Sequence, residues 1–199
     1  MDMRHEIINY LIEKYSYKTY LEIGCQKQRC FKQIKCETKH SVDPNWPAMY
    51  KTTSDGFFDK LDREGDTIKY DLIFIDGDHC ESAVAKDIEN SLRYLSGKGL
   101  ILVHDMSPDN EKFARSKPLK TAPVWYGDGF KVLMRLRSTN PHLFVRTIDT
   151  DRGIGVIRPT CGRQKLTDVS EFSYEVMDQD RRETIGLISV DEFVEIFGQ

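Results

Sequence analysis

Asp71-Leu-Ile-Phe-Ile-Asp76 is the stretch of the sequence that decides the fold. Its four central residues are all apolar, which is typical of a strand covered on both faces, as in a parallel sheet between helices. Leu100-Ile-Leu-Val-His-Asp105 repeats the pattern, and Ala83–Tyr94 between the two carries apolar residues at helical spacing. These three segments predict a strand–helix–strand unit.

Strand and helix patterns alternate on both sides of this unit. Toward the N-terminus the sequence predicts helices over 3–15, Cys30–Lys35 and from Ser54 onward, and strands over Thr19–Gly24, His40–Pro44 and Met49–Thr52. Toward the C-terminus it predicts a long loop over 106–123, a helix over Gly129–Ser138, a hairpin of Leu143–Ile148 and Gly153–Ile157, and helices in Ser170–Arg182 and Val190–Phe197. Alternation followed by a hairpin predicts a doubly wound, Rossmann-like α/β sheet, mostly parallel with a terminal antiparallel strand.

The 199 residues, of which 39% are hydrophobic and 31% charged, fit one globular domain. We expect this domain to span 1–160, with 161–199 as its C-terminal helical extension. The net charge of −3 disfavours a nucleic-acid partner, and no apolar stretch is long enough to span a membrane. The five cysteines form no CxxC pair and the N-terminus is not a secretory signal, which predicts a cytoplasmic protein with reduced thiols. The sequence leaves the oligomeric state open.

An acidic side chain lies at the end of four predicted strands: Glu22, Asp43, Asp76 and Asp105. In open α/β sheets ligands bind beyond the carboxyl ends of the strands, so these acids predict a binding site there. Gly24 permits a sharp turn beside a ligand, and Asp43 follows about 20 residues later, where nucleotide-binding folds hold ribose hydroxyls. A structural turn glycine and a turn-forming Asp-Pro are the alternatives, but together the two residues favour a nucleoside ligand.

Five segments carry a resemblance to a known family: YLEIGC (20–25), SVDP (41–44), TSDGFFDKL (53–61), YDLIFIDGDHCESAVAKDIENSLRYLSGKGLILVHDMSP (70–108) and VWYGDGFKVLMRLR (124–137). They resemble class I S-adenosylmethionine-dependent methyltransferases, of a bacterial type often associated with glycan or natural-product pathways. The resemblance covers about residues 18–158. It implies the strand order 3-2-1-4-5-7-6, with strand 7 antiparallel, and S-adenosylmethionine as the cofactor.

The same resemblance implies a set of cofactor-binding positions: Glu22 and Gly24 on the methionine side, Asp43 at the ribose hydroxyls, Ser54 and Asp55 near the adenine, and Asp76 beside the sulfonium. The chain departs from the family in the loop after Gly24. These families usually keep at least one more glycine there, whereas this loop reads Cys25-Gln-Lys-Gln-Arg29. A side chain such as Gln28 could therefore crowd the cofactor.

Asp76-Gly-Asp-His79 and His104-Asp105 end adjacent predicted strands, so their side chains can converge. A histidine titrates near neutral pH and can take the proton from a substrate hydroxyl as the methyl group transfers. His79 lies in a loop and is the better candidate for this base, whereas His104 fits a hydrogen-bonded core histidine equally well. Asp76 lies beside the sulfonium and substrate by the resemblance, and completes the candidate catalytic set.

The alternative to a histidine base is a magnesium ion held by Asp76 and Asp105, which would lower the pKa of a substrate hydroxyl. Metal-dependent O-methyltransferases that resemble this layout have acids at these two positions. A further oxygen ligand is expected beside the second acid, where this chain has Met106. Asp78 and Asp105 fit caps of the segments that follow them as an alternative to any chemistry.

Trp125-Tyr-Gly-Asp128 follows the long loop and has two interpretations. Aromatic rings and an acid can bind a sugar, because rings stack on its apolar faces and a carboxylate accepts its hydroxyl hydrogens. The segment can equally be an anchor, with Trp125 packed on the core and Asp128 capping the next helix.

The leading functional hypothesis is O-methylation of a small hydroxylated acceptor such as a sugar or glycan precursor. The alternative is a non-catalytic, methyltransferase-like binding or scaffold protein, which the glycine-poor loop suggests. A nicotinamide oxidoreductase is disfavoured, because the first turn lacks GxGxxG and no tyrosine–lysine pair at helical spacing stands out as a proton relay.

Overall fold

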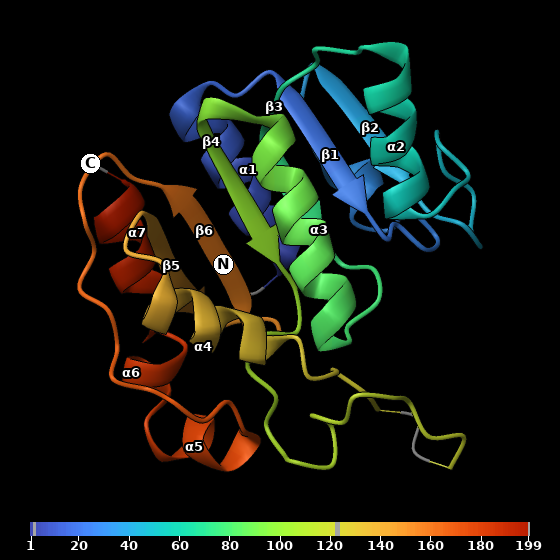
Figure 1. The fold of residues 1–199 in the computed structure, drawn as a ribbon. Helices are drawn as coiled ribbons and strands as arrows, with labels where there is room; N and C mark the ends of the chain where they lie inside the picture. Colours follow the sequence, from blue (N-terminus) through green and yellow to red (C-terminus); the bar gives the residue numbers. More distant parts are fainter. Residues whose placement is uncertain (2, 122–123, 199) are drawn as a thin grey trace. The chain divides into compact units, whose positions relative to one another are not determined.

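A computed structural model of the chain describes residue 1, residues 3–121 and residues 124–198. The chain divides into two compact units, each discontinuous in sequence. The first unit comprises Met1–Asp78 and Lys86–Leu102, and the second comprises His79–Ala85 and Val103–Gln199. Figure 1 colours both along the sequence. None of the described helices has the length and apolar character needed to cross a membrane.

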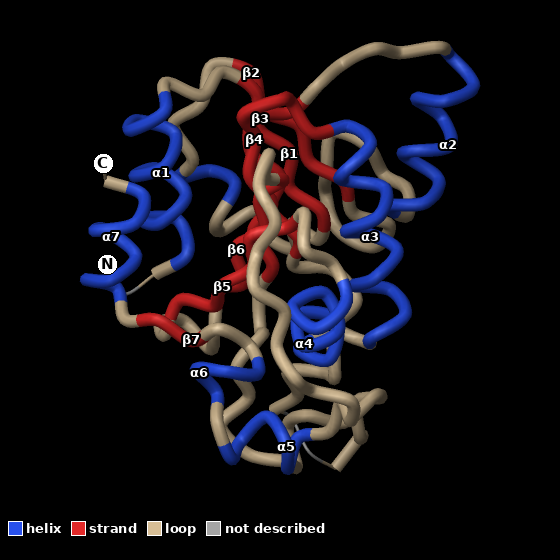
Figure 2. Tube along the Cα trace, turned by 60° about the vertical axis from the view of Figure 1, so that its left-hand side comes forward, coloured by secondary structure: helices blue, strands red, loops and turns tan. Residues whose placement is uncertain are grey.

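The first unit is a parallel sheet between helices. Its elements are α1 (Arg4–Tyr15), β1 (Thr19–Ile23), the short 3-10 helix η1 (Phe31–Gln33), β2 (Thr38–Val42), α2 (Ser54–Glu64), β3 (Tyr70–Ile75), most of α3 (Glu81–Tyr94) and β4 (Leu95–Val103). The strand order is β2-β1-β3-β4, and β1 pairs in parallel with both β2 and β3. Figure 2 shows α1 on one side of these strands and α2 and α3 on the other. This is the doubly wound arrangement that the sequence predicts.

The structure confirms the prediction that the apolar run of β3 is a strand covered on both faces. Leu72, Ile73 and Phe74 have no exposed surface, and Ile75 is 1% exposed, so both faces of the strand are covered. On β1, Ile23 lies opposite Val42 and Ile75 in the register of the two parallel pairs. The three strands therefore end level with one another, and the residues that follow them emerge at one edge of the sheet.

The second unit contains α4 (Phe130–Thr139), β5 (Leu143–Ile148), β6 (Ile154–Pro159), α5 (Tyr174–Gln179), α6 (Arg181–Thr184), β7 (Leu187–Ile188) and α7 (Val190–Phe197). The strand order is β6-β5-β7, with β5 antiparallel to β6 and parallel to β7. Figure 2 shows α4 on one side of β5 and β6 and α7 on the other. One core cluster joins α4 to the C-terminal segment through Phe130, Met134, Met177 and Ile185, none of which is exposed.

Each unit contains its part of the predicted order 3-2-1-4-5-7-6. In the first unit β2-β1-β3-β4 correspond to strands 2-1-4-5, and the strand predicted over Met49–Thr52 is reduced to one parallel bridge between Tyr50 and Val42. It is this short because Thr53 already caps α2 by accepting the Gly56 N–H. In the second unit β6 and β5 correspond to strands 7 and 6, and β7 was not predicted.

Three element boundaries were predicted wrongly. The helix expected over Cys30–Lys35 is only η1, because the Asn9 side chain accepts from Lys35 N and donates to Gln33 O, which a longer helix would need for itself. Strand β4 begins at Leu95 and runs through the glycines that were expected to precede it. The helix expected over Ser170–Arg182 is split into α5 and α6 at Asp180, whose side chain caps α6. The domain boundary at residue 160 stays a prediction, and Ala122 and Pro123 of the long loop lie outside the described residues.

Gly24 has a positive φ of 81°, and a Cβ built on it would collide with the carbonyl oxygen of Asp76. Gly65 has φ 63° with no atom within 4 Å of the same position. We expect Gly65→Ala to cost about 1 kcal/mol, the penalty of a left-handed conformation alone. Gly24→Ala should cost at least about 3 kcal/mol, because the backbone must also move. Urea unfolding of both variants measures the difference, and equal costs would show that the close approach at Gly24 is unimportant.

Candidate cofactor and catalytic site

Glu22 is a buried carboxyl at the end of β1, with 1% of its surface exposed. The Tyr20 hydroxyl donates to Glu22 Oε2 at 2.5 Å. Burial raises the pKa of Glu22 to about 7, against the lowering effects of the Tyr20 bond, the Cys30 thiol and the charge of Arg4. The carboxyl can therefore change its charge near neutral pH.

Asp76, directly after β3, is paired with Arg4 from the first turn of α1. Arg4 Nη1 lies 2.5 Å from Asp76 Oδ2, and both side chains are about 15% exposed (16% and 15%). Sequence analysis missed Arg4. A signal was available, because a cation in the first turn opposes the helix dipole and so suggests a partner elsewhere. The pair brings a guanidinium to the edge where the strands end.

The glycine-poor loop after Gly24 adopts the backbone conformation that glycine favours. Gln26 has φ 42° and Gln28 has φ 59°, both in the left-handed region. The Gln28 side chain donates from Nε2 to Pro47 O at 2.8 Å, in the loop after β2. Its amide is thus engaged with the neighbouring loop, and Gln26 is exposed.

Asp43 connects the loops after β1 and β2. Its Oδ2 accepts from Gln26 N, and its Oδ1 accepts from Asn45 N and Trp46 N, each at 2.9 Å. The residue is only 4% exposed. A carboxylate has about four acceptor sites, so Asp43 retains capacity for a ligand hydroxyl at Oδ2 beside its three backbone bonds.

The two residues expected near the adenine lie on the first turn of α2 and contact α3. Asp55 Oδ1 accepts from Asn90 Nδ2 at 3.2 Å. Ser54 forms a hydrogen bond with Asp87, whose pKa burial raises to about 6 in spite of that bond. Ser54 and Asp55 therefore join two helices of the first unit, while Glu22, Gly24, Asp43 and Asp76 gather where β1, β2 and β3 end.

In the second unit, Asp105 lies between the two candidate histidines. Its Oδ2 is 3.1 Å from His79 Nδ1, and its Oδ1 is 3.1 Å from His104 Nδ1. His104 Nε2 lies 3.5 Å from an oxygen of Asp151 in turn. The side chains of His104 and Asp105 are 1% and 4% exposed, whereas that of His79 is 14% exposed. His79 is thus the histidine of the pair that reaches the surface, and Asp105 fixes the orientation of its ring.

Two residues of the turn before β6 complete this cluster and were not singled out from the sequence. Asp151 contacts His104, and Arg152 Nη1 lies 3.5 Å from Asp105 Oδ1. Both have positive φ, 43° and 67°, and Asp105 has φ 62°. Non-glycine residues in this region are uncommon and cost free energy, which the surrounding contacts must outweigh. The sequence marked this segment only as a hairpin turn.

The Trp125–Asp128 segment is an anchor. Trp125 Nε1 donates to Arg115 O at 2.6 Å, and its ring meets the His79 ring edge-on with centroids 5.3 Å apart. Asp128 is 5% exposed and its Oδ1 accepts from Glu81 N, so it caps α3 and not, as expected, the helix that follows it. The indole holds one face of the candidate base in place.

The residues proposed for a metal ion are already paired with cations or histidines. Asp76 forms an ion pair with Arg4, and Asp105 contacts Arg152 as well as both histidines. Aspartate and histidine are suitable ligand types. However, Mg²⁺ would need to displace Arg4, and Met106, where a further ligand was expected, is fully buried. An arginine therefore already compensates the charge of each of these two acids.

Comparisons with known proteins agree with this architecture. Residues 21–106 match the family model of a methyltransferase domain. A search of curated proteins finds no significant match. Three solved structures share the fold at low sequence identity. The O-methyltransferase from Bacillus cereus in complex with SAH is 12% identical, with a TM-score of 0.56 over 77% of this chain and 78% of that one.

The other two structures have similar TM-scores and match a similar share of this chain. The SAH-bound methyltransferase PaMTH1 from Podospora anserina is 20% identical, with a TM-score of 0.52 over 80% of each chain. MycE, from the mycinamycin biosynthetic pathway and solved with Mg, SAH and mycinamycin VI, is 12% identical, with a TM-score of 0.51 over 83% of this chain and 50% of its own. At these identities the similarity to the solved structures establishes the fold alone. The match to the methyltransferase-domain model is a similarity of residues 21–106, less than half of the chain.

Proposed function

We propose that this protein transfers the methyl group of S-adenosylmethionine to a hydroxyl oxygen of a small acceptor, such as a sugar or glycan precursor. The observation that carries the proposal is the contact between His79 and Asp105. A surface-reaching imidazole oriented by a buried carboxylate is a suitable group for removing a hydroxyl proton. The five free cysteines support a reducing, cytoplasmic environment for the protein.

The residues at the ends of β1, β2 and β3 fit the cofactor. Asp43 retains acceptor capacity for ribose hydroxyls, and Glu22 and Asp76 offer negative charge to the ammonium and sulfonium groups. Arg4, which already contacts Asp76, adds a cation suited to the cofactor's carboxylate. Ser54 and Asp55 stay the proposed adenine neighbours through their place on the first turn of α2.

In the proposed reaction S-adenosylmethionine supplies the methyl group, and the chain's own residues handle the proton. His79 Nδ1 lies against Asp105, and we assign Nε2 as the nitrogen that accepts the hydroxyl proton. Bound beside Glu22, Asp43 and Asp76, the cofactor would supply the methyl group to the acceptor oxygen and would leave as a neutral thioether. Asp105 stabilises the imidazolium, and His104, which itself lies 3.5 Å from Asp151, contacts the other oxygen of Asp105.

We expect His79→Ala to lower turnover by about 10²-fold or more while the affinity for S-adenosylhomocysteine stays unchanged. Turnover is measured as S-adenosylhomocysteine release with a panel of monosaccharide acceptors, and affinity by calorimetry. Added imidazole should restore part of the lost turnover, which a purely structural histidine would not allow. His142→Ala, which alters an exposed histidine outside the cluster, is the control and should behave as the original protein. Unchanged turnover in His79→Ala would remove it from the role of base.

The second candidate mechanism is magnesium held by Asp76 and Asp105. Because Arg4 and Arg152 already compensate these acids, we expect turnover to survive treatment with EDTA and to be unaffected by added Mg²⁺. Turnover of the EDTA-treated and magnesium-supplemented protein is compared at equal ionic strength. Loss of activity with EDTA and its return with Mg²⁺ would replace the histidine-base mechanism by the metal-assisted one.

The pKa of Glu22, about 7, makes cofactor binding depend on pH. The cofactor's ammonium group favours the ionised carboxylate, so below pH 7 the protein must release a proton on binding. We expect affinity to fall by up to about tenfold per pH unit below 7, and Glu22→Gln to abolish that slope. Calorimetry with S-adenosylhomocysteine measures this pH dependence of the affinity. The titrations run from about pH 5.5 to about pH 8, which brackets the pKa of Glu22.

Unfolding without ligand provides an independent check on Glu22. Its pKa is raised on folding, so the folded state holds the proton more tightly than the unfolded state. Stability relative to Glu22→Gln should therefore fall as the pH rises from 4.5 to about 7 and then level off. A parallel pH dependence in the two proteins would contradict the assignment.

A non-catalytic scaffold is the other function to test, because the loop after Gly24 has glutamines, Gln26 and Gln28, at two positions of positive φ. A ligand that binds only the folded protein raises its melting temperature. We expect S-adenosylhomocysteine to raise it, and no shift at millimolar ligand would favour the scaffold.

A further inference from the structure

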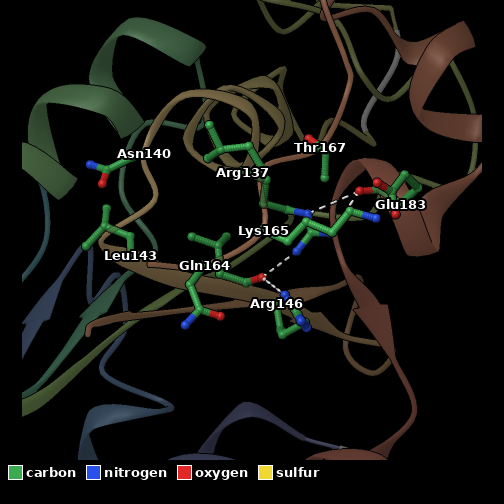
Figure 3. A pocket seen from close by; sticks show the side chains of 10 residues that line it. Arg137, Asn140, Leu143, Arg146, Gln164, Lys165, Thr167 and Glu183 are labelled. Carbon is green, nitrogen blue, oxygen red and sulfur yellow. Dashed lines mark hydrogen bonds between the residues drawn. The ribbon is translucent and has the colours of Figure 1, made fainter. Parts of the chain in front are cut away.

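A separate pocket of about 190 Å³ lies in the second unit, at the last turn of α4 and the start of β5 (Figure 3). Its lining includes Arg137, Asn140, Arg146, Gln164, Lys165 and Thr167. Figure 3 shows these side chains around one space, with Glu183 at its margin. The lining is therefore rich in hydrogen-bond donors and in positive charge.

The cations outnumber the acids in this lining. Arg137, Arg146 and Lys165 are three positive side chains, and Glu183 is the single acidic one. Burial, together with the charge of Arg146, lowers the pKa of Arg137 to about 10. Burial also lowers the pKa of Arg146, and Glu183 opposes the shift in both. Two partly buried guanidinium groups thus repel each other with too little negative charge beside them.

The two arginines differ in how many of their donors the protein itself uses. Arg137 donates to the carbonyl oxygens of Glu183, twice, and of Val145, at 2.8 to 3.2 Å. Arg146 donates once, from Nη1 to Val145 O at 2.8 Å, and the dashed lines of Figure 3 mark such bonds. A guanidinium has five N–H donors. Arg137 is therefore mainly a structural link between α4, β5 and α6, whereas Arg146 keeps most of its donors for another partner.

Thr167 provides a second, independent indication of a ligand. The residue lines the pocket and is only 7% exposed, and its Oγ1 has no hydrogen-bond partner among the described residues. Its backbone N–H donates to Arg137 O, which holds it against the arginines. A buried hydroxyl without a partner costs free energy, so a ligand that drew the Thr167 hydroxyl toward the pocket would recover that cost.

The wall behind the arginines is built around Gly186. A Cβ at this position would lie 2.6 Å from Arg137 Nη1 and 3.1 Å from Arg146 Cδ, and φ is 67°. The absence of a side chain allows both arginines to pack over the backbone just before β7. The pocket is thus a formed feature of the second unit.

We propose that this pocket binds the phosphate group of a small phosphorylated ligand. A tetrahedral oxyanion accepts several hydrogen bonds at once, which matches the donors of Arg146, the Thr167 hydroxyl and Lys165. Its charge compensates the repulsion between the two arginines. A planar carboxylate offers fewer acceptor directions and less charge.

The pocket is separate from the proposed methyl-transfer chemistry. His79 O accepts from Gly129 N at the start of α4, whereas Arg137 and Asn140 lie at its end. About eight residues of helix, roughly 12 Å, separate the two ends. The phosphate site is therefore an additional binding function that does not depend on the methyl transfer.

Calorimetric titration of the full chain with inorganic phosphate, against chloride at equal ionic strength, tests the proposal. We expect saturable binding, weakened about tenfold or more in Arg146→Gln because a charge-assisted bond is lost. Thr167→Val should weaken it several-fold while the melting temperature stays equal or rises, since no internal hydrogen bond is removed. Acetate should bind more weakly than phosphate.

Arg158→Gln is the matched control, because it removes the same charge from a partly buried arginine of β6 that does not line the pocket. It should bind phosphate as the original protein does. Absence of saturable binding, equal weakening in Arg158→Gln and Arg146→Gln, or acetate binding as tightly as phosphate would each overturn the proposal. Because Thr167→Val is expected to fold normally, unchanged affinity in that variant would overturn the assigned role of the hydroxyl even if Arg146→Gln were unstable.

Discussion

The register of β1 against its two parallel neighbours determines where the candidate cofactor residues of the first unit lie. Since Ile23 pairs with both Val42 and Ile75, the residues that follow these three strands emerge side by side. Gly24 tightens this edge, because only a residue without Cβ and at ease with positive φ can lie against the Asp76 carbonyl. Buried acids and backbone donors then meet in a small volume, where burial and charge set their properties.

The candidate catalytic site and the pocket beside α4 differ in how their charged side chains are compensated. Asp76 and Asp105 each lie beside an arginine, and Asp105 also contacts two histidines, so it can orient a base. In the pocket beside α4 the imbalance is reversed, since Arg137 and Arg146 share one acidic neighbour. A carboxylate that has partners can position a reacting group, whereas cations that lack them attract an anion.

Several parts of the fold could be predicted because their signals are local. The apolar run of β3, the helical spacing in α2 and α4, and the hairpin of β5 and β6 each depend on neighbouring residues in the sequence. The errors arose where a distant residue intervened. Asn9 takes the backbone groups that a longer helix after Cys30 would have used, and β7 exists only because β5 offers it an edge.

The sequence by itself determined the fold class and the acids at the strand ends, since apolar pattern and order along the chain are sufficient for these. Only the tertiary structure decided the partners of those acids. Arg4 on Asp76, the Gln26 N–H on Asp43, and Asp151 behind His104 join segments far apart in the chain. Such contacts depend on how folded segments meet in space, and a hydrogen bond between distant residues leaves no periodic trace in the sequence.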